Sequence, residues 1–342
     1  MRIDLITPDE IGSVEEADWR RLQRAARPLS PPSLSPGWVR CVGAARPDAR
    51  VAVVRDGAGR IHGFLPVQAG KGQVVETLGA SLDLGCGFVG DPALKWGARD
   101  WLRGLRARAL EFSGAAENQV EFAAAARGGD IRMIAELHGG AGAYLALRRA
   151  QTDTDLLETR AHRLGAIAAE FGAPRMRLVS CAREDFDQTM FWSADAFRRP
   201  QLDWEIAALR AAFEREDDSF AGALFTLTAG DALLAGAFFL LDQRSAQLVF
   251  YGEASTAAAH ASAAIVVADA IAAFAARGID EVDLGCSDGF IAREFATRRR
   301  PVLYGRIRPA ERSRFPVALR ETFTPRAVRA ARSWSDAGPA VH

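Results

Sequence analysis

The chain has 342 residues, 49% hydrophobic and 25% charged, so it is long enough for one large globular domain or two ordinary ones. Lysine plus arginine and aspartate plus glutamate each number 43, and this balance excludes a global field that would recruit nucleic acid or an anionic membrane. The four cysteines are far apart and form no Cys-x-x-Cys pair, so neither a disulfide framework nor a zinc site is indicated.

The first residues carry acids where a signal peptide would have a basic and then an apolar stretch, and no apolar run approaches about 18 residues. We therefore expect no signal peptide, no transmembrane segment and a cytoplasmic protein. The histidines are not spaced as metal ligands, so no metal is expected. An arginine-rich tail at 324–342 is expected to fray, and it leaves open a peripheral contact with the inner membrane.

The first 150 residues alternate short apolar runs with turn residues. Ser35 followed by Pro36 is typical of a helix start, and the helix is expected to run through Cys41. Two apolar runs on either side of a glycine-bearing turn predict a β-hairpin. The elements expected after that helix are hairpin strands at 51–55 and 61–67, a strand at 73–78, an amphipathic helix at 93–111 and a strand at 120–124.

The second half repeats this order with stronger signals. A long helix is expected to follow a domain boundary near residue 150, and a hairpin turns at Gly230. The expected elements are helices at 153–171, 184–198 and 262–277 and strands at 177–181, 223–228, 234–241, 247–251 and 281–285. A strand, a helix and a strand within about thirty residues form a right-handed crossover, so the last strand should lie parallel to an earlier neighbour. We expect an α/β fold with a mixed sheet, in two units at 1–150 and 151–323.

The tetrapeptide Asp-Leu-Gly-Cys occurs twice, at 83–86 and 283–286. Each copy resembles the glycine loop that follows a strand in class I S-adenosylmethionine methyltransferases. The second copy leaves too little chain for the further strand–helix units that such an enzyme needs, and the first follows a hairpin. Coincidence between two strand ends is the preferred interpretation, and a methyltransferase stays as an alternative.

Several stretches, taken in order, resemble the CelD-like branch of the GNAT acyltransferase superfamily, which is related to the Fem peptidoglycan-bridge transferases. The resemblance rests on the order and spacing of weak motifs over most of the chain. They are the Ser-Pro-x-Trp element at 35–38, the hairpin at 51–67, the stretch 162–199, the hairpin at 233–241 with Gly236, Tyr251-Gly252-Glu253, and 282–285. It implies two GNAT-like halves in tandem and an N-acyltransferase that acts on an amine, such as an amino sugar, in exopolysaccharide biosynthesis.

The resemblance also bears on the donor. GNAT enzymes bind the pyrophosphate of coenzyme A at the start of the crossover helix, where glycines allow close approach. Here that stretch, 257–264, contains alanine, one histidine and one serine but no glycine. Acyl-coenzyme A, an acyl carrier protein and a charged tRNA therefore all remain candidate donors. Ser262 and Ala263 are the candidate donor-binding residues.

Amide formation needs a base, donors for the oxyanion and an acid for the leaving group. The candidate catalytic residues are Asp288 in the loop after the last strand, Glu253 and Tyr251 at the end of the strand before the helix, and His260 just before the helix. Each residue also has a simpler interpretation. Asp288 could cap a helix and Glu253 could be a solvated turn carboxylate. Tyr251 could be a core residue and His260 a surface residue.

Candidate acceptor-binding residues lie elsewhere. Arg293 and Arg298 could hold the phosphate of a nucleotide- or lipid-linked sugar, although charge runs are usually solvated. Asp203 and Trp204, expected in a loop, could line a cleft between the halves. A catalytically silent member of a polysaccharide assembly is the third hypothesis, because the glycines before the crossover helix are missing.

Overall fold

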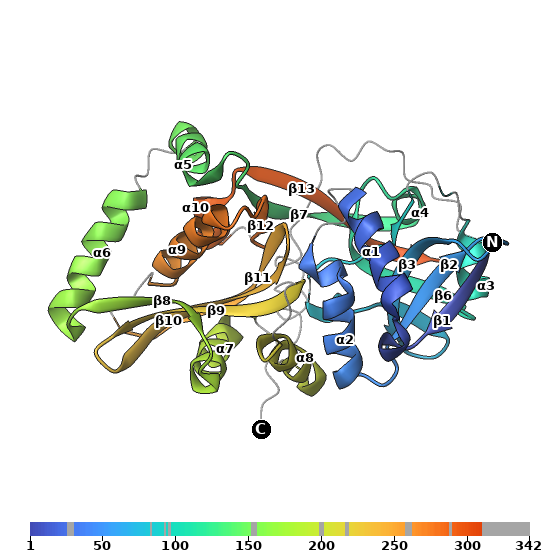
Figure 1. The fold of residues 1–342 in the computed structure, drawn as a ribbon, viewed down its shortest axis with the longest axis horizontal. Helices are drawn as coiled ribbons and strands as arrows, with labels where there is room; N and C mark the ends of the chain where they lie inside the picture. Colours follow the sequence, from blue (N-terminus) through green and yellow to red (C-terminus); the bar gives the residue numbers. More distant parts are fainter. Residues whose placement is uncertain are drawn as a thin grey trace, which may run out of the picture.

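The computed structural model describes residues 1–25, 31–82, 84–91, 94, 97–151, 156–197, 202–215, 219–256, 262–286 and 289–309. Two lobes lie beside each other and share one continuous sheet (Figure 1). Within those ranges, no helix has both the length and the apolar character needed to cross a membrane.

The first lobe has two helices after its first strand, then three antiparallel strands, a crossover helix and a parallel strand. Its elements are β1 (Arg2–Ile6), α1 (Ser13–Ala25), α2 (Pro36–Ala45), β2 (Arg50–Arg55), β3 (Ile61–Ala69), β4 (Val74–Thr77), α3 (Ala98–Gly104), β6 (Ala109–Ala116), α4 (Val120–Ala124) and β7 (Ala126–Glu136), with β5 (Val89–Gly90) paired to β3. β4 and β6 are parallel, as the crossover requires.

The second lobe repeats this order of elements after two connecting helices. The connectors are α5 (Gly140–Gln151) and α6 (Leu156–Phe171). The lobe consists of β8 (Pro174–Ser180), α7 (Arg183–Phe197), α8 (Asp203–Phe213), β9 (Phe220–Ala229), β10 (Ala232–Asp242), β11 (Ser245–Glu253), α9 (Ser262–Ala276), β12 (Glu281–Asp283), α10 (Phe290–Phe295) and β13 (Arg298–Ile307). β11 and β12 are parallel, like β4 and β6.

The last strand of each lobe lies in the sheet of both. The described residues form one 13-stranded sheet in the order β1-β2-β3-β4-β6-β13-β7-β12-β11-β10-β9-β8, with β5 to the side. β13 pairs with β6 of the first lobe, β7 pairs with β12 of the second, and β7 and β13 pair with each other. The two lobes have therefore exchanged their final strands, and the centre of the sheet belongs to both.

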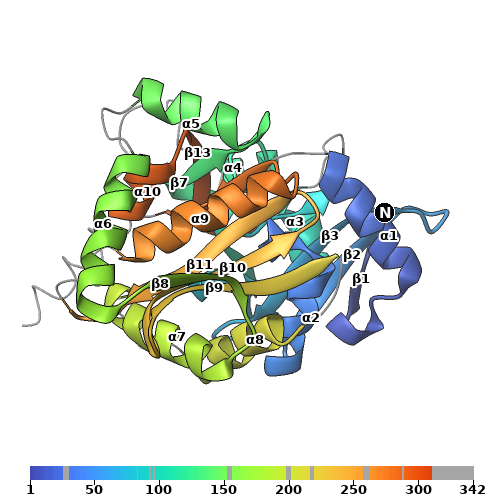
Figure 2. The same cartoon turned by 60° about the vertical axis from the view of Figure 1, so that its left-hand side comes forward.

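Helices cover both faces of the second lobe's sheet. α9 lies on one face, whereas α7 and α8 lie on the other (Figures 1 and 2). The α9 side buries a cluster that includes Phe225, Phe239 and Phe274, and the α7 side a cluster with Phe186, Phe238 and Phe250. Consecutive residues of β10, such as Phe238 and Phe239, thus point to opposite cores, as the alternation of a strand requires.

The predicted fold class, an α/β fold with a mixed sheet, is confirmed. Both predicted hairpins form, Ser35 accepts a hydrogen bond from the Trp38 N–H at 3.2 Å to cap α2, and the predicted parallel pair is β11 with β12. Helices and strands of the second half match their expected ranges to within a few residues.

Two elements of the first half were predicted wrongly. The amphipathic helix expected at 93–111 is a helix only at 98–104; Arg106 has φ 52, and the chain then enters β6. The strand expected at 120–124 is the short helix α4, which buries Phe122 against Phe112 and leaves Val120 73% exposed.

Helix α7 lies very close to the sheet over a pair of glycines. Gly236 and Gly252 are directly opposite each other on β10 and β11. A Cβ atom at Gly236 would lie 2.2 Å from Thr189 Oγ1, and one at Gly252 would lie 2.8 Å from the Thr189 carbonyl oxygen. The absence of a side chain at both positions lets the helix backbone approach the strands.

We therefore expect Gly236→Val to lower the free energy of unfolding by about 2–3 kcal/mol, because overpacking forces the helix away from the sheet. Urea denaturation measures the change. Gly142→Ala is the matched control, since no atom lies within 4 Å of an added Cβ there, and it should be neutral or slightly stabilising. An unchanged midpoint for Gly236→Val would show that α7 can shift without cost.

Candidate functional site

The parallel strands β11 and β12 separate partway along their length. They pair only over Ser245–Gln247 and Glu281–Asp283. Beyond Asp283 the chain stays with β7, where the Leu284 N–H donates to Met133 O at 2.8 Å and the Met133 N–H to Gly285 O at 2.8 Å. β11 instead continues to Glu253 beside β10. The β11 edge after Gln247 thus faces no partner strand among the described residues.

A β-bulge on β11 lies at the same place. Phe238 is opposite Phe250 and Phe239 is opposite Leu248, so Val249 is the extra residue. Val249 and Phe250 both belong to the core on the α7 side, whereas Leu248 belongs to the core on the α9 side. The bulge turns the strand where it leaves β12, and a ligand with a carbonyl oxygen could reach its free N–H groups.

Charged side chains line one face of the central strands. Arg132 on β7 donates to Asp283 on β12 at 2.6 Å, and both side chains are 2% exposed. Arg300 on β13 donates to both oxygens of Glu281 at 2.7 and 2.6 Å. The Arg132–Asp283 pair therefore joins the exchanged strand β7 to the second lobe, and the Arg300–Glu281 pair spans β7 between two strands of the second lobe.

Both Asp-Leu-Gly-Cys segments approach this network. Arg132 Nη1 donates to Cys286 Sγ at 3.6 Å, and an added Cβ at Gly85 would lie 4.0 Å from the same nitrogen. The Leu84 carbonyl accepts from Ser33 Oγ at 2.7 Å and from the amide of Gln247. The two segments are therefore neighbours at the junction of the lobes, although their residues Asp83 and Asp288 lie outside the described ranges.

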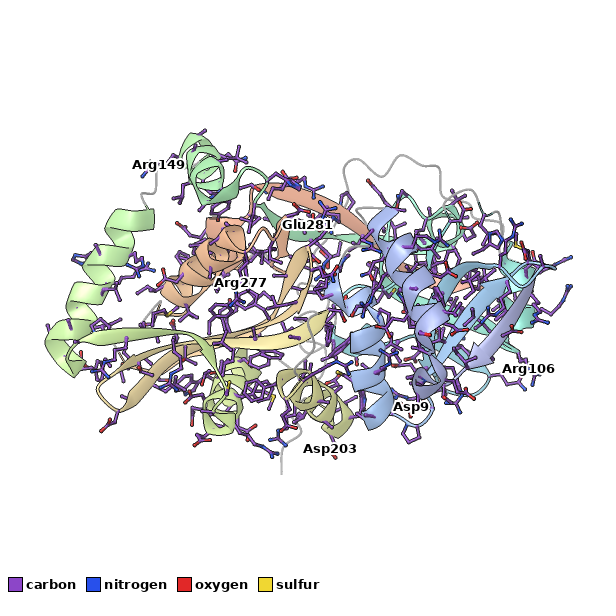
Figure 3. All side chains as sticks on the ribbon, viewed as in Figure 1. Asp9, Arg106, Arg149, Asp203, Arg277 and Glu281 are labelled. Atoms are coloured by element: carbon purple, nitrogen blue, oxygen red, sulfur yellow. The ribbon has the colours of Figure 1, made fainter. Side chains whose placement is uncertain are left out.

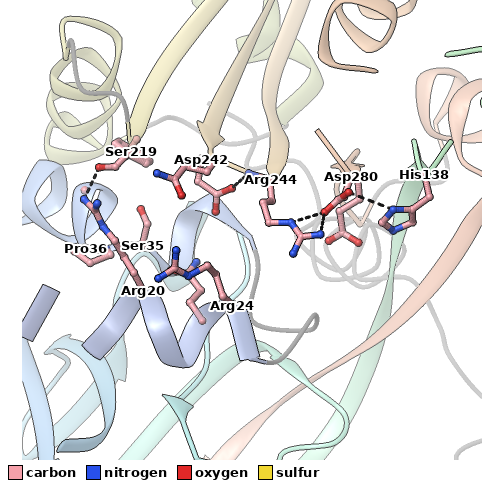
Figure 4. A pocket seen from close by; sticks show the side chains of 14 residues that line it. Arg20, Arg24, Ser35, Pro36, His138, Ser219, Asp242, Arg244 and Asp280 are labelled. Carbon is pink, nitrogen blue, oxygen red and sulfur yellow. Dashed lines mark hydrogen bonds and ion pairs between the residues drawn. The ribbon is translucent and has the colours of Figure 1, made fainter. Parts of the chain in front are cut away.

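A cleft between the lobes lies at the other end of β11 (Figure 4). Its walls come from α1 and the start of α2 in the first lobe, and from the β10–β11 turn, the start of β9 and the start of β12 in the second. Arg244 and His138 both contact Asp280, with Arg244 Nε 2.6 Å from Oδ2 and His138 Nδ1 3.3 Å from Oδ1. Arg24 also lines the cleft, and its guanidinium forms no hydrogen bond or ion pair with the described residues.

Asp242 has the most unusual environment in this cleft. Its Oδ1 accepts from the Arg244 and Ser245 N–H groups, each at 2.8 Å, and from Ser245 Oγ at 3.0 Å. Its Oδ2 has no hydrogen-bond partner in the described ranges. Burial raises the pKa of this carboxyl to about 6, although the three hydrogen bonds favour the ionised form. Asp242 can therefore gain or lose a proton near neutral pH with one oxygen available to a ligand.

Four of the predicted site residues come together at the far end of β11. Glu253 Oε2 accepts from the Ala263 N–H at 3.0 Å, so the carboxylate caps the start of α9. Ser262 is 1% exposed, and its Oγ has no hydrogen-bond partner among the described residues. Burial first, and the Glu253 charge second, raise the pKa of Tyr251 above its ordinary value.

The other predicted residues lie elsewhere. Asp203 and Trp204 begin helix α8 rather than forming a loop; Trp204 packs against the core under Arg46, whose guanidinium carbon is 5.0 Å from the ring centre. Figure 3 shows Asp203 at the edge of the molecule, away from Glu281. Arg298 forms ion pairs with Glu136 at 2.8 Å and Glu281 at 3.1 Å, whereas Arg293 is exposed on α10. His260 and Asp288 lie outside the described residues.

Sequence reasoning missed Asp242, Arg132 and Gln247. Asp242 stands in a short polar stretch after an apolar run, which is typical of an ordinary turn, and no local pattern reports its burial. Arg132 and Arg300 became buried because a distant strand supplies each carboxylate. The described residues contain no group of three or more histidine, cysteine, aspartate or glutamate side chains that could hold a metal ion.

The buried pair predicts a clear stability pattern. Arg132→Met leaves the Asp283 carboxylate in its buried position without its cation, and we expect a loss of about 3–5 kcal/mol. The double variant Arg132→Met/Asp283→Leu should recover most of that loss because it removes both charges. Guanidinium denaturation measures both values, and a double variant as unstable as the single one would contradict a cost due to the unpaired charge.

Asp242 predicts a pH-dependent stability. The folded-state pKa of about 6 lies above that of the unfolded chain, so ionisation of Asp242 costs stability as pH rises from about 4 to about 6. Asp242→Asn should therefore raise the free energy of unfolding by about 3 kcal/mol at pH 8 and have little effect at pH 4. Thermal unfolding across this range measures it, and equal effects at both pH values would contradict the assigned pKa.

One part of the chain matches a known protein family. A family model for an acetyltransferase (GNAT) domain matches residues 159–293, which include β9–β12, α9 and the second Asp-Leu-Gly-Cys segment. No curated protein matches the chain significantly.

Solved structures with little sequence identity share the fold. The C-terminal domain of a proposed lysylphosphatidylglycerol synthetase from Agrobacterium fabrum is 12% identical, with a TM-score of 0.50 over 85% of this chain and 92% of that one. A conserved protein of unknown function from Bacteroides thetaiotaomicron is 11% identical, with a TM-score of 0.52 over 89% and 98%. At these identities the likeness shows a common fold and no more.

The family match and the architecture agree. The matched residues contain the hairpin, the bulged strand, the crossover helix and the parallel strand, in the order that the sequence predicted. Residues 159–293 therefore match a GNAT acetyltransferase domain in both sequence and architecture.

Proposed function

We propose that this chain transfers an acyl group from a thioester to the amine of an acceptor held in the cleft between the lobes. The observation that carries the proposal is the separation of β11 from β12 at the Val249 bulge, inside the GNAT domain. The amine nitrogen attacks the thioester carbonyl, the C–N bond forms, the C–S bond breaks, and the amine proton passes to a base while the thiol leaves. N–H groups on the free edge of β11 are suited to stabilise the oxyanion.

The two ends of β11 suit two different substrates. One end meets the start of α9, where the predicted donor residues Ser262 and Ala263 lie. The other end meets the cleft that contains Asp242 and Arg24. A donor that enters from the α9 end and an acceptor that enters from the cleft would meet near Gln247, where the strands separate.

The cleft favours an acceptor that carries both a positive and a negative group. The free oxygen of Asp242 can pair with an ammonium, and the Arg24 guanidinium can pair with a phosphate or carboxylate. Ser245 and Gln247 are two residues apart on β11, a rise of about 7 Å, so Asp242 is an acceptor-binding residue rather than the base. The amino sugar of a nucleotide- or lipid-linked precursor has this combination of charges.

The proposal also includes candidate residues for proton transfer and a biological role. Asp288, after β12 and its glycine, is our candidate for the base, and Tyr251 and His260 are candidates for the acid that protonates the leaving thiol. The resemblance to CelD-like proteins supports a role in exopolysaccharide biosynthesis at the cytoplasmic side of the inner membrane. No described feature favours a methyltransferase, because the second glycine loop belongs to the acetyltransferase domain.

Thermal shifts identify the class of donor. Saturating ligand at about 100 times its dissociation constant stabilises a protein by about 2.7 kcal/mol, a readily measured shift. We expect stabilisation by an acyl-thioester and none by S-adenosylmethionine. Thiol release in the presence of glucosamine-type amines then reports transfer. A shift with S-adenosylmethionine alone would overturn the proposal, and silence from every donor would favour a binding role.

Asp242→Asn tests the acceptor site in the same assay. The variant keeps the hydrogen bonds of Oδ1 and removes the charge, so we expect the KM for the amine to rise about tenfold with a smaller change in kcat. In the unsubstituted protein this KM should fall as pH rises through about 6, because the carboxyl becomes ionised, and the variant should lack that step.

Asp231→Asn, in the exposed β9–β10 turn, is the matched control and should leave the acceptor KM unchanged. A pH step that persists in Asp242→Asn would assign the titration to another group. An unchanged KM in that variant would place the amine elsewhere.

A further inference from the structure

The start of α9 already holds an anion supplied by the chain itself. The first N–H groups of this 15-residue helix have no partners inside the helix, and the helix dipole makes this end attractive to negative charge. Glu253 Oε2 accepts from one of them, the Ala263 N–H, at 3.0 Å. Because Glu253 is the last residue of β11, the carboxylate lies where the strand edge and the helix end meet.

Two further observations show that this end is a polar site that the protein does not fill completely. The Ser262 hydroxyl, 1% exposed, has no hydrogen-bond partner among the described residues. Tyr251, two residues before Glu253 and partly buried against the core on the α9 side, donates no hydrogen bond to the described residues. Both hydroxyls are available to a polar ligand beside the strand.

We propose that Glu253 is a specificity-determining residue of the donor site, which keeps the pyrophosphate of coenzyme A away from the α9 end. The inference rests on the proposed function, because it assumes that the donor is a thioester held beside β11. A phosphate at this helix end would displace the carboxylate or share its N–H groups against like-charge repulsion. The donor is therefore held by its acyl-pantetheine arm, whose amide groups can hydrogen-bond to the free edge of β11 as an added strand would.

The matched pair acetyl-coenzyme A and S-acetyl-pantetheine tests this, because only the first carries pyrophosphate. Calorimetric titration of the full chain should give dissociation constants within about threefold of each other for the two donors. In Glu253→Gln, whose amide oxygen can still cap α9, acetyl-coenzyme A should bind about tenfold more tightly and S-acetyl-pantetheine should bind unchanged.

Glu170→Gln is the control, since it removes one negative charge from an exposed position on α6 without touching the donor helix. It should change neither dissociation constant. Thermal unfolding of each variant confirms that it is folded.

The possible failures are distinguishable. If Glu253→Gln binds acetyl-coenzyme A no more tightly than the unsubstituted protein does, the inference about Glu253 is wrong while the proposed transfer stands. If acetyl-coenzyme A binds the unsubstituted protein more than tenfold more tightly than S-acetyl-pantetheine, the pyrophosphate is recognised despite Glu253, and the inference is again wrong. If neither thioester binds any variant, the thioester donor of the proposed function fails, and the inference fails with it.

Discussion

β7 and β13 pair with each other at the centre of the sheet, and each also pairs with a strand of the opposite lobe. This exchange forces charged residues into the interior, because Arg132 and Arg300 lie on the exchanged strands. Each therefore needs a carboxylate at hydrogen-bond distance, and β12 supplies both, as Asp283 and Glu281. A buried ion pair adds little net stability, but it strongly penalises any arrangement that separates its partners. The pairs thus select one register of β7, β12 and β13.

The same arrangement creates the site. β12 is short because the chain pairs with β7 alone after Asp283, and among the described residues this leaves the second half of β11 without a neighbouring strand on that side. The bulge at Val249 and the Gln247 amide, which reaches Leu84 in the first lobe, lie at this point. The exchange of β7 and β13 therefore creates both the unpaired edge of β11, where we place the donor, and the cleft between the lobes. Neither lobe alone would contain both. Asp242 lowers the stability of the fold at neutral pH, because the carboxyl that is available to a ligand is also a partly desolvated charge.

Sequence patterns predicted the elements that are formed by residues close together in the chain. The hairpins, the capped helix at Ser35 and the crossover of 262–285 all follow from turn residues and apolar spacing within about thirty residues. Pairing between distant strands leaves no such pattern. The run Arg298-Arg299-Arg300 is typical of a solvated surface or a phosphate contact, yet it begins a central strand whose counter-charges lie on β7 and β12. Likewise, Glu253 and Tyr251 were predicted as catalytic residues and Ser262 and Ala263 as donor-binding residues from their places along the chain. Asp242 was missed because its turn sequence does not report its burial.

Two features of the donor end of the domain act in the same direction. The sequence at 257–264 contains no glycine, the residue that most readily allows a large anion to approach the backbone closely. With Glu253 as a cap, the charge at that helix end is already balanced from within the chain. A helix end whose charge is already balanced contributes little to binding a pyrophosphate, so we expect the β11 edge and the hydroxyls of Tyr251 and Ser262 to discriminate between donors. The β11 edge and the two hydroxyls can hydrogen-bond to amide groups but carry no charge. A donor would therefore be selected by its acyl-pantetheine arm, which carries the reacting thioester.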